Sequence, residues 1–372
     1  MATSLLLTAC FLFPLAIVAN SGPLPAFKRI YQFGDSLSDT GNLLRWGKMF
    51  YPADRLPYGE TYFRKATGRF SDGRLILDHI AAALKLPFIN PYLNTNASFA
   101  HGVNFAVAGA TANDLDFFTK RNVTMPTFKP PISQQLKWFE AHVNSTCRSR
   151  RRAASCSAKF GTNSLFIFGE YGGNDYFPAF QQGKSIDEVK SYVPYTVAAI
   201  VRGIKRIVKL GAKRIIVPGP LPFGCMPSQL SAFAGAGAGT DPTDYDEFGC
   251  LKPYNSFTSY HNRYLRALVS SLHREFSGEG VVIVYADYYG GFMDILRNAT
   301  QLGFDKGLLL KACCGTGGEY KFDHNRPCGS DGVGSCSEPG RAVHWDGVHL
   351  TDAAYHHISQ FVIDQVFSKL AF

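Results

Sequence analysis

The chain has 372 residues, of which 46% are hydrophobic and only 18% are charged, and this composition excludes a largely disordered protein. Its formal net charge of +9 is compatible with a nucleic-acid partner, an acidic surface or polymer, or export to an acidic medium. Because the sequence lacks an aromatic RNA-binding motif, we expect no nucleic-acid partner.

The N-terminus contains an uncharged apolar stretch at residues 5–18, followed by small or polar residues at 19–22. This stretch is too short to span a bilayer, so it predicts a signal peptide over residues 1–22 that is removed on export. A buried N-terminal helix is the alternative. We expect no transmembrane segment in the rest of the chain.

Short apolar runs then alternate with longer helical patterns. Strands are predicted at 30–33, 164–168, 214–217 and 281–286, with a further apolar run at 103–108; helices are predicted at 75–84, 132–143, 195–210, 254–276 and 351–370. Runs bounded by Gly or Pro are typical of strands covered on both faces, and this alternation predicts an α/β fold with a parallel sheet. No break in composition marks a second domain, so we expect one domain over residues 28–370.

Removal of a signal peptide would leave eight cysteines, an even number that predicts disulfides in an exported protein. Close spacing favours Cys147–Cys156 and Cys225–Cys250, with the last four cysteines paired among themselves. A zinc site in that last group is the alternative. The last four cysteines are Cys313, Cys314, Cys328 and Cys336.

Two surface features fit an exported protein. N-glycosylation sequons begin at Asn96, Asn122, Asn144 and Asn298. A basic cluster lies within the predicted Cys147–Cys156 loop, either as a solvated loop or as a contact for an acidic cell-wall polymer. Its members are Arg148, Arg150, Arg151 and Arg152.

Ser36 follows the first predicted strand, in the segment Phe33-Gly34-Asp35-Ser36-Leu37-Ser38-Asp39-Thr40-Gly41-Asn42. Ligands of open α/β sheets bind outside the carboxyl ends of strands, so this serine is placed where a nucleophile could reach a substrate. A serine that caps a helix would occupy the same turn. The lipase elbow G-x-S-x-G is absent, which excludes an ordinary α/β-hydrolase layout.

Asp346 and His349 lie three residues apart, just before the last predicted helix. A serine hydroxyl needs a base to take its proton, and that base needs a group that orients it. The spacing allows the carboxylate to reach the imidazole Nδ1 and leaves Nε2 free. A surface turn with a capping Asp, or a metal site that includes His344, are the alternatives.

Two further positions could supply hydrogen-bond donors to an oxyanion. Gly109 ends the apolar run at 103–108 and could present its backbone N–H, and Asn174 follows the strand predicted at 164–168 and could present its amide. With the Ser36 N–H they would make three donors. Each glycine alone is also typical of an ordinary turn.

These four segments, in this order, resemble the conserved blocks of the GDSL lipase/esterase family in its large plant branch, within the SGNH hydrolases. The resemblance extends from about Arg29 to the last predicted helix, and Phe33-Gly34-Asp35-Ser36 with Asp39-Thr40-Gly41-Asn42 is its most specific part. It implies a three-layer α/β/α sandwich with a flavodoxin-like parallel sheet.

The resemblance also implies the chemistry. Ser36 would be the nucleophile, His349 the base, Asp346 its orienting group, and Ser36, Gly109 and Asn174 the oxyanion donors, with no metal or organic cofactor. We expect hydrolysis of a small-molecule or polymer-linked ester. An acyltransferase on the same triad and a non-catalytic protein that binds a wall polymer are the alternatives. Lipid, acetylated polysaccharide, phenolic ester and acetylated alkaloid are all open as substrates, and the cell wall and the vacuole as destinations.

Overall fold

The computed structural model describes residues 24–47, 52–125, 129–147, 160–161, 163–233 and 241–371. Five strands of this part form one sheet in the order β2-β1-β3-β4-β5, and every neighbouring pair is parallel. This is the flavodoxin-like strand order. The strands are β1 (Arg29–Phe33), β2 (Gly102–Asn104), β3 (Ser164–Phe168), β4 (Arg214–Pro218) and β5 (Val282–Ala286).

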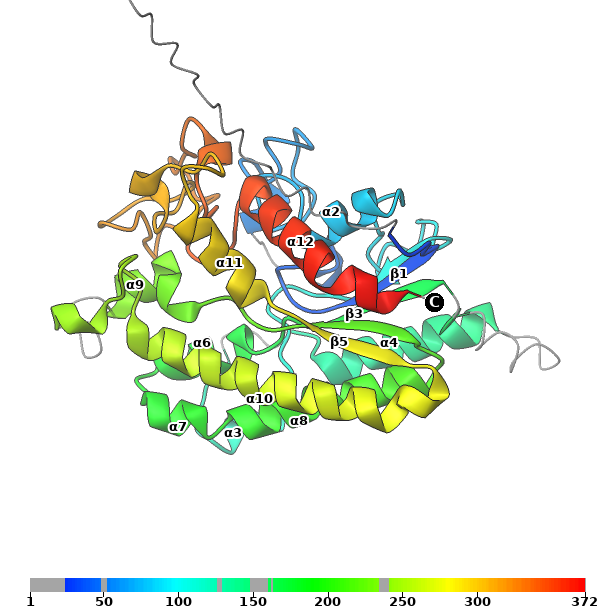
Figure 1. The fold of residues 1–372 in the computed structure, drawn as a ribbon. Helices are drawn as coiled ribbons and strands as arrows, with labels where there is room; N and C mark the ends of the chain where they lie inside the picture. Colours follow the sequence, from blue (N-terminus) through cyan, green and yellow to red (C-terminus); the bar gives the residue numbers. More distant parts are fainter. Residues whose placement is uncertain are drawn as a thin grey trace, which may run out of the picture.

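Helices cover both faces of this sheet (Figure 1). One layer contains α4, α8 and α10, in which α8 packs against both of the others, and the other layer contains α2, α11 and α12, in which α12 packs against both of the others. The described α-helices are α1 (Leu43–Trp46), α2 (Ile76–Ala83), α3 (Leu115–Thr119), α4 (Ile132–Thr146), α6 (Gly173–Gln181), α7 (Ile186–Lys190), α8 (Val193–Lys209), α9 (Pro227–Phe233), α10 (Lys252–Phe276), α11 (Tyr288–Arg297) and α12 (Asp352–Val366). The chain is therefore the predicted α/β/α sandwich.

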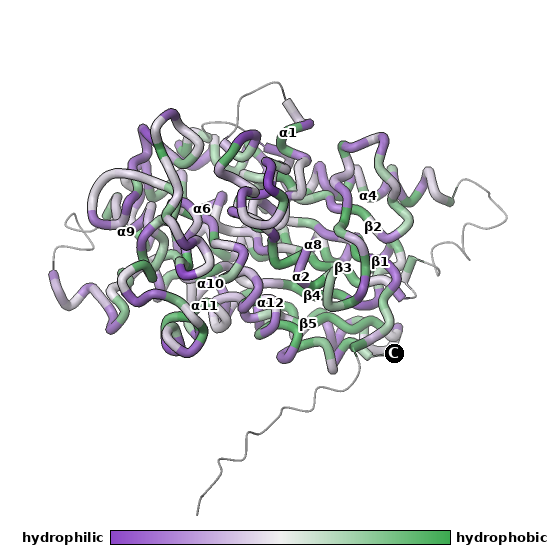
Figure 2. Tube along the Cα trace, turned by 90° about the horizontal axis from the view of Figure 1, so that it is seen from above, coloured by the Kyte–Doolittle hydropathy of each residue, from purple (hydrophilic) through white to green (hydrophobic). Residues whose placement is uncertain are grey.

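The strands hold the two layers together by alternating their side chains. Tyr31 and Phe33 of β1 belong to the core on the α4, α8 and α10 side, whereas Ile30 belongs to the core on the α2, α11 and α12 side. Successive residues of a strand point to opposite faces, so a continuous apolar run can fill both cores. Figure 2 shows these hydrophobic strands inside a more hydrophilic periphery.

Each predicted strand and helix is present in the structure, and two of them differ in extent. The apolar run at 103–108 forms a strand only over Gly102–Asn104, and the helix predicted at 351–370 ends at Val366 and continues as a 3-10 turn, η8 (Phe367–Leu370). Six of the described helices have no counterpart among the predicted ones, namely α1, α3, α6, α7, α9 and α11. The predicted signal peptide lies outside the described residues, and no helix of the described residues is long and apolar enough to cross a membrane.

The disulfides follow the predicted grouping where the structure describes them. Cys225 is bonded to Cys250, and the last four cysteines form two disulfides among themselves, so the zinc alternative for that group is wrong. Their pairs are Cys313–Cys336 and Cys314–Cys328. Cys147 is disulfide-bonded, and its predicted partner Cys156 lies outside the described residues, as do the arginines at 148 and 150–152.

The four sequon asparagines differ in accessibility. Asn96, Asn122 and Asn144 are exposed, as a glycan acceptor must be. Asn298 is half-buried, and its Nδ2 donates a hydrogen bond of 2.8 Å to Asp294 Oδ1. The first three positions are therefore better placed for modification than the fourth.

Candidate active site

Ser36 lies just beyond the carboxyl end of β1, at the point where the strand order reverses. β1 has β2 on one side and β3 on the other, so the chain connections run in opposite directions on the two sides of β1. Open α/β sheets form their ligand-binding crevices at such a point. The turn into Ser36 depends on Gly34, whose φ is +151°. A Cβ at Gly34 would lie 2.8 Å from Glu170 Oε1, so a glycine at this position allows the buried Glu170 carboxyl group to lie close to the turn.

Asp346 and His349 form a hydrogen-bonded pair in the turn before α12. His349 Nδ1 lies 2.8 Å from Asp346 Oδ2 and 2.9 Å from Oδ1. The backbone N–H groups of Val348 and His349 each donate to Asp346 Oδ1 at 2.8 Å. The short turn therefore supplies both the imidazole and the donors that fix the carboxylate.

The protonation state of the pair follows from these contacts. Burial alone would raise the pKa of Asp346, but the charge of His349 and the hydrogen bonds from His349 and Val348 outweigh it and lower the pKa to about 2. An ionised carboxylate can only accept, so His349 carries its proton on Nδ1 when neutral. His349 Nε2 is buried and has no hydrogen-bond partner among the described residues, which leaves its lone pair available as a base.

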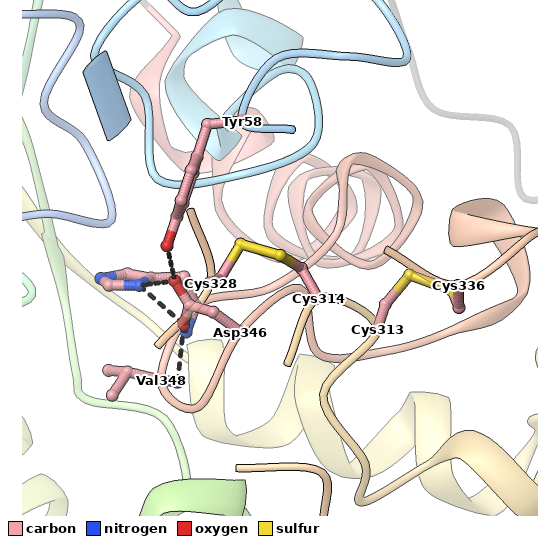
Figure 3. The surroundings of a disulfide bond; sticks show 8 residues. Tyr58, Cys313, Cys314, Cys328, Cys336, Asp346 and Val348 are labelled. Carbon is pink, nitrogen blue, oxygen red and sulfur yellow. Dashed lines mark hydrogen bonds and ion pairs between the residues drawn. A yellow bond between two sulfur atoms is a disulfide. The ribbon is translucent and has the colours of Figure 1, made fainter. Parts of the chain in front are cut away.

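Two aromatic residues from a distant segment support the pair. The hydroxyl of Tyr58, a buried residue, donates to Asp346 Oδ2 at 2.8 Å, and Figure 3 shows this hydrogen bond. The Phe70 ring packs on the His349 imidazole with centroids 4.7 Å apart. Sequence analysis missed both residues, because nothing in the local pattern links them to a turn almost 290 positions later.

The two disulfides of the last four cysteines support the turn that holds Asp346 and His349 from its other side. The Cys313 N–H donates to the His344 carbonyl at 3.0 Å and the Cys314 N–H donates to the Trp345 carbonyl at 2.6 Å. Figure 3 shows both disulfides beside Asp346. The disulfides fix the backbone of Cys313 and Cys314, and this backbone in turn holds the segment that leads to Asp346 through the two hydrogen bonds.

Ser36 opens onto a small cleft that it shares with the other predicted site segments. The cleft has a volume of about 40 Å³. Its polar lining residues are Asp35, Ser36, Glu170 and Asn174, and Val348 brings the turn that holds Asp346 and His349 to the same space. The rest is mainly apolar and is formed by Leu37, Phe177, Pro220, Leu221, Phe223 and Met226. The structure thus brings three of the four predicted segments to one cleft.

The three predicted oxyanion donors differ in whether they are already hydrogen-bonded within the protein. Within the described residues, the backbone N–H groups of Ser36 and Gly109 have no hydrogen-bond partner. The Asn174 amide nitrogen, in contrast, donates to Asp35 Oδ2 at 2.9 Å and to the Ala110 carbonyl at 3.1 Å. Asn174 must therefore exchange one of these bonds before it can donate to a substrate.

Buried carboxylates hold the loops that carry these donors. Asp39 accepts from the Ala108 N–H at 2.9 Å, directly before Gly109. Asp175 accepts from the Ala112 N–H at 2.9 Å, and from the Asn113 N–H at 3.0 Å. These acids belong to the motifs that contain Ser36 and Asn174, but no local sequence pattern indicates that they hold these loops in place.

The metal site considered for His344, Asp346 and His349 is not formed. In the described part of the chain, the one group whose ligand atoms converge is Cys225, Asp246 and Cys250, and both of its sulfurs are used in a disulfide. His344 is fully buried, and burial lowers its pKa to about 3, so it packs as a neutral residue of the core.

Known proteins resemble this chain over almost its whole length. The profile of the family described as GDSL-like Lipase/Acylhydrolase matches residues 30–362. Acetylajmalan esterase 1 of Rauvolfia serpentina is 44% identical over 363 residues, which cover 96% of this chain and 92% of that protein. Sinapine esterase of Brassica napus is 40% identical over 381 residues, covering 100% of this chain and 95% of that protein.

Proposed function

This chain belongs to the GDSL-like lipase/acylhydrolase family and is a carboxylic ester hydrolase, and we propose that it works through an acyl-enzyme on Ser36. The observation that carries the proposal is the state of His349. Its Nδ1 is held by Asp346, while its buried Nε2 lacks a hydrogen-bond partner in the part of the chain that the structure describes, and the neighbouring Val348 shares a cleft with Ser36.

The proposed reaction has two halves. Ser36 Oγ attacks the ester carbonyl as His349 Nε2 takes the hydroxyl proton, and Asp346 stabilises the imidazolium that forms. The oxyanion accepts hydrogen bonds from the backbone N–H groups of Ser36 and Gly109 and from the Asn174 amide. His349 then protonates the leaving alcohol, and afterwards it activates water to release the acid and restore Ser36.

A short acyl group fits the cleft best. The cleft beside Ser36 has a volume of only about 40 Å³, and its apolar side chains, among them Phe177 and Phe223, suit a small apolar acyl group such as acetyl. The name of the relative acetylajmalan esterase 1 refers to an acetyl ester, which agrees with this size. We therefore place acetyl and similarly small esters of small-molecule alcohols ahead of long-chain lipids and polymer-linked esters.

The proposal is tested first with Ser36→Ala. This variant should keep the melting temperature of the wild type and lose turnover of a chromogenic acetyl ester. Turnover like that of the wild type in Ser36→Ala would remove the mechanism. Product analysis with added alcohols separates hydrolysis from acyl transfer, because a transferase would form a new ester in place of the free acid.

Export to an oxidising compartment accompanies the proposed activity. The predicted signal peptide, the described disulfides and the three exposed sequon asparagines support it. Glycan mapping and N-terminal sequencing of the protein recovered from the medium of expressing plant cells test it. Retention of residues 1–22 would contradict the export proposal and leave the catalytic proposal untouched.

An acidic cell-wall polymer is the proposed macromolecular partner. In the described part of the chain, α8 carries Arg202, Lys205, Arg206 and Lys209 on its solvent side, beside Glu140, which pairs with Arg206. Lys205 also pairs with Glu275, which leaves Arg202 and Lys209 as the excess positive charge of this surface. Such a surface attracts polyanions in a salt-dependent manner. Co-sedimentation with a polygalacturonate that is lost in high salt supports this partner, and equal sedimentation with a neutral glucan contradicts it.

A further inference from the structure

Two buried acids lie directly behind the proposed nucleophile. Asp35 is 5% exposed and Glu170 is 2% exposed, and their carboxyl groups are hydrogen-bonded to each other. Asp35 precedes Ser36 in the chain, and Glu170 follows β3, four positions before Asn174. Both residues line the cleft with Ser36. The proposed triad mechanism uses neither of them.

Glu170 is held firmly in this position. Its Oε1 accepts from the Asp35 N–H at 3.3 Å and from Ser38 Oγ at 2.9 Å. Ser38 Oγ in turn accepts from Gln32 Nε2 at 3.0 Å. The backbone of Glu170 has a φ of +50°, a left-handed conformation that costs free energy for any residue except glycine. Such a conformation persists only where the surrounding contacts enforce it.

The pair reaches the oxyanion donors through Asp35. Asp35 Oδ1 accepts from the Leu37 N–H at 3.0 Å, and Oδ2 accepts from Asn174 Nδ2 at 2.9 Å. The second Asn174 amide hydrogen points to the neutral Ala110 carbonyl at 3.1 Å. A hydrogen bond to a charged acceptor is the stronger of the two, so the bond to Ala110 is the one that is exchanged when an oxyanion forms.

The two acids carry one negative charge between them. Burial and the neighbouring Asp35 charge raise the pKa of Glu170 well above its usual range, so Glu170 keeps its proton. Burial raises the pKa of Asp35 to about 6, and near neutral pH it carries the charge. Glu170 can then donate its proton into a hydrogen bond with the Asp35 carboxylate.

We propose that Glu170 is a positioning residue, which through Asp35 anchors one amide hydrogen of Asn174 so that the other is aimed at the oxyanion. The inference rests on the proposed function, because it assigns Glu170 to the oxyanion site of that reaction. It predicts that a neutral side chain of the same shape can replace Glu170. Glutamine meets this condition, since its amide both accepts and donates.

The test compares Glu170→Gln with Glu170→Ala on a chromogenic acetyl ester. Glu170→Ala should lower kcat by about 20–100-fold, with KM within about twofold, because the lost contacts act on the transition state. Glu170→Gln should stay within about threefold of wild-type kcat. Glu338→Gln, at an exposed glutamate, is the control for the substitution itself. Equal damage from Gln and Ala would overturn the proposal.

A double-mutant cycle with Asn174→Ala tests the route of action. If Glu170 acts through Asn174, then Glu170→Ala should change kcat by less than about twofold in the Asn174→Ala background. Full additivity would contradict the route. If Glu170→Ala does not fold, Ser38→Ala takes its place in the cycle, since it removes one donor to Glu170. An inactive Ser36→Ala together with an additive cycle leaves the esterase mechanism standing and rejects only the role of Glu170.

Discussion

The hydroxyl of Tyr58 donates a 2.8 Å hydrogen bond to the carboxylate of Asp346, a residue 288 positions later in the chain. Tyr58 lies between two other aromatic rings, with centroids 5.8 Å from Phe70 and 5.9 Å from Trp345. Phe70 itself packs on His349. A small aromatic cluster from the N-terminal part of the domain therefore fixes the acid–base pair of the C-terminal part.

Tyr58→Phe should reduce kcat/KM by about 10- to 100-fold, since a hydrogen bond to a charged group contributes roughly 1.5–3 kcal/mol and the packing is retained. Steady-state kinetics on an acetyl ester measures this. Tyr264→Phe, at an exposed position of α10, is the matched control and should leave kcat/KM unchanged. If Tyr58→Phe kept wild-type kcat/KM, the Tyr58 hydrogen bond would have no part in orienting Asp346.

The disulfide Cys314–Cys328 closes a short loop and fixes the backbone of Cys314, which is hydrogen-bonded to the Trp345 carbonyl. Its removal by Cys314→Ser with Cys328→Ser should lower the free energy of unfolding by about 3 kcal/mol, as the loop length predicts. It should also lower kcat at temperatures where the variant is still folded, because the turn to Asp346 loses its fixed neighbour. Thermal unfolding and kinetics at 15 °C measure the two effects. An unchanged kcat would restrict this disulfide to a role in stability.

Much of the fold could be predicted from the sequence, because its strands are apolar runs bounded by Gly or Pro. Helix α11 could not be predicted in this way. It contains Gly290 and Gly291 within a mainly aromatic and apolar segment, and its first turn depends on Asp287, which accepts from the Gly290 N–H at 3.0 Å. Helix α6 is similar, since it contains Pro178 in its interior, a residue that normally argues against a helix.

The site could be predicted only where its chemistry lies in short motifs. Ser36, Asp346, His349, Gly109 and Asn174 were identified from such motifs and remain predictions of role. Tyr58 and Glu170 act through partners that the fold brings close, and neither has a local signal. Only the coordinates show that the Asn174 amide is already engaged by Asp35.

Asp175 gives a prediction for stability against pH. Burial raises its pKa to about 7 in the folded protein, above the usual value of 3.8 that the unfolded chain retains. The folded state therefore binds the Asp175 proton more tightly than the unfolded chain does. The contribution of this proton to the free energy of unfolding is full below pH 3.8 and is lost as the pH rises through 7. The melting temperature of the wild type minus that of Asp175→Asn should be larger at pH 5 than at pH 8. The same difference at both pH values would show that Asp175 is already ionised at pH 5 in the fold.

The size of the cleft gives a prediction for acyl selectivity. Phe177 lines the cleft and packs on Phe223 with centroids 4.7 Å apart. Phe177→Ala should shift the preference from acetyl toward butyryl and hexanoyl esters by roughly tenfold in relative kcat/KM, because a removed ring leaves room for several methylene groups. Phe117→Ala, at a half-buried ring outside the cleft, is the control. A wild-type preference for long-chain esters would refute the assignment of this cleft to the acyl group.

The nucleophile itself is tested most directly by covalent labelling. The wild-type protein, treated with a fluorophosphonate and digested, should carry one adduct, and mass spectrometry should place it on Ser36. Ser36→Ala should carry none, and His349→Ala should label far more slowly because its base is missing. An adduct on a different serine, or equally fast labelling of Ser36→Ala, would contradict the account of this enzyme as a serine esterase with its nucleophile at the end of β1.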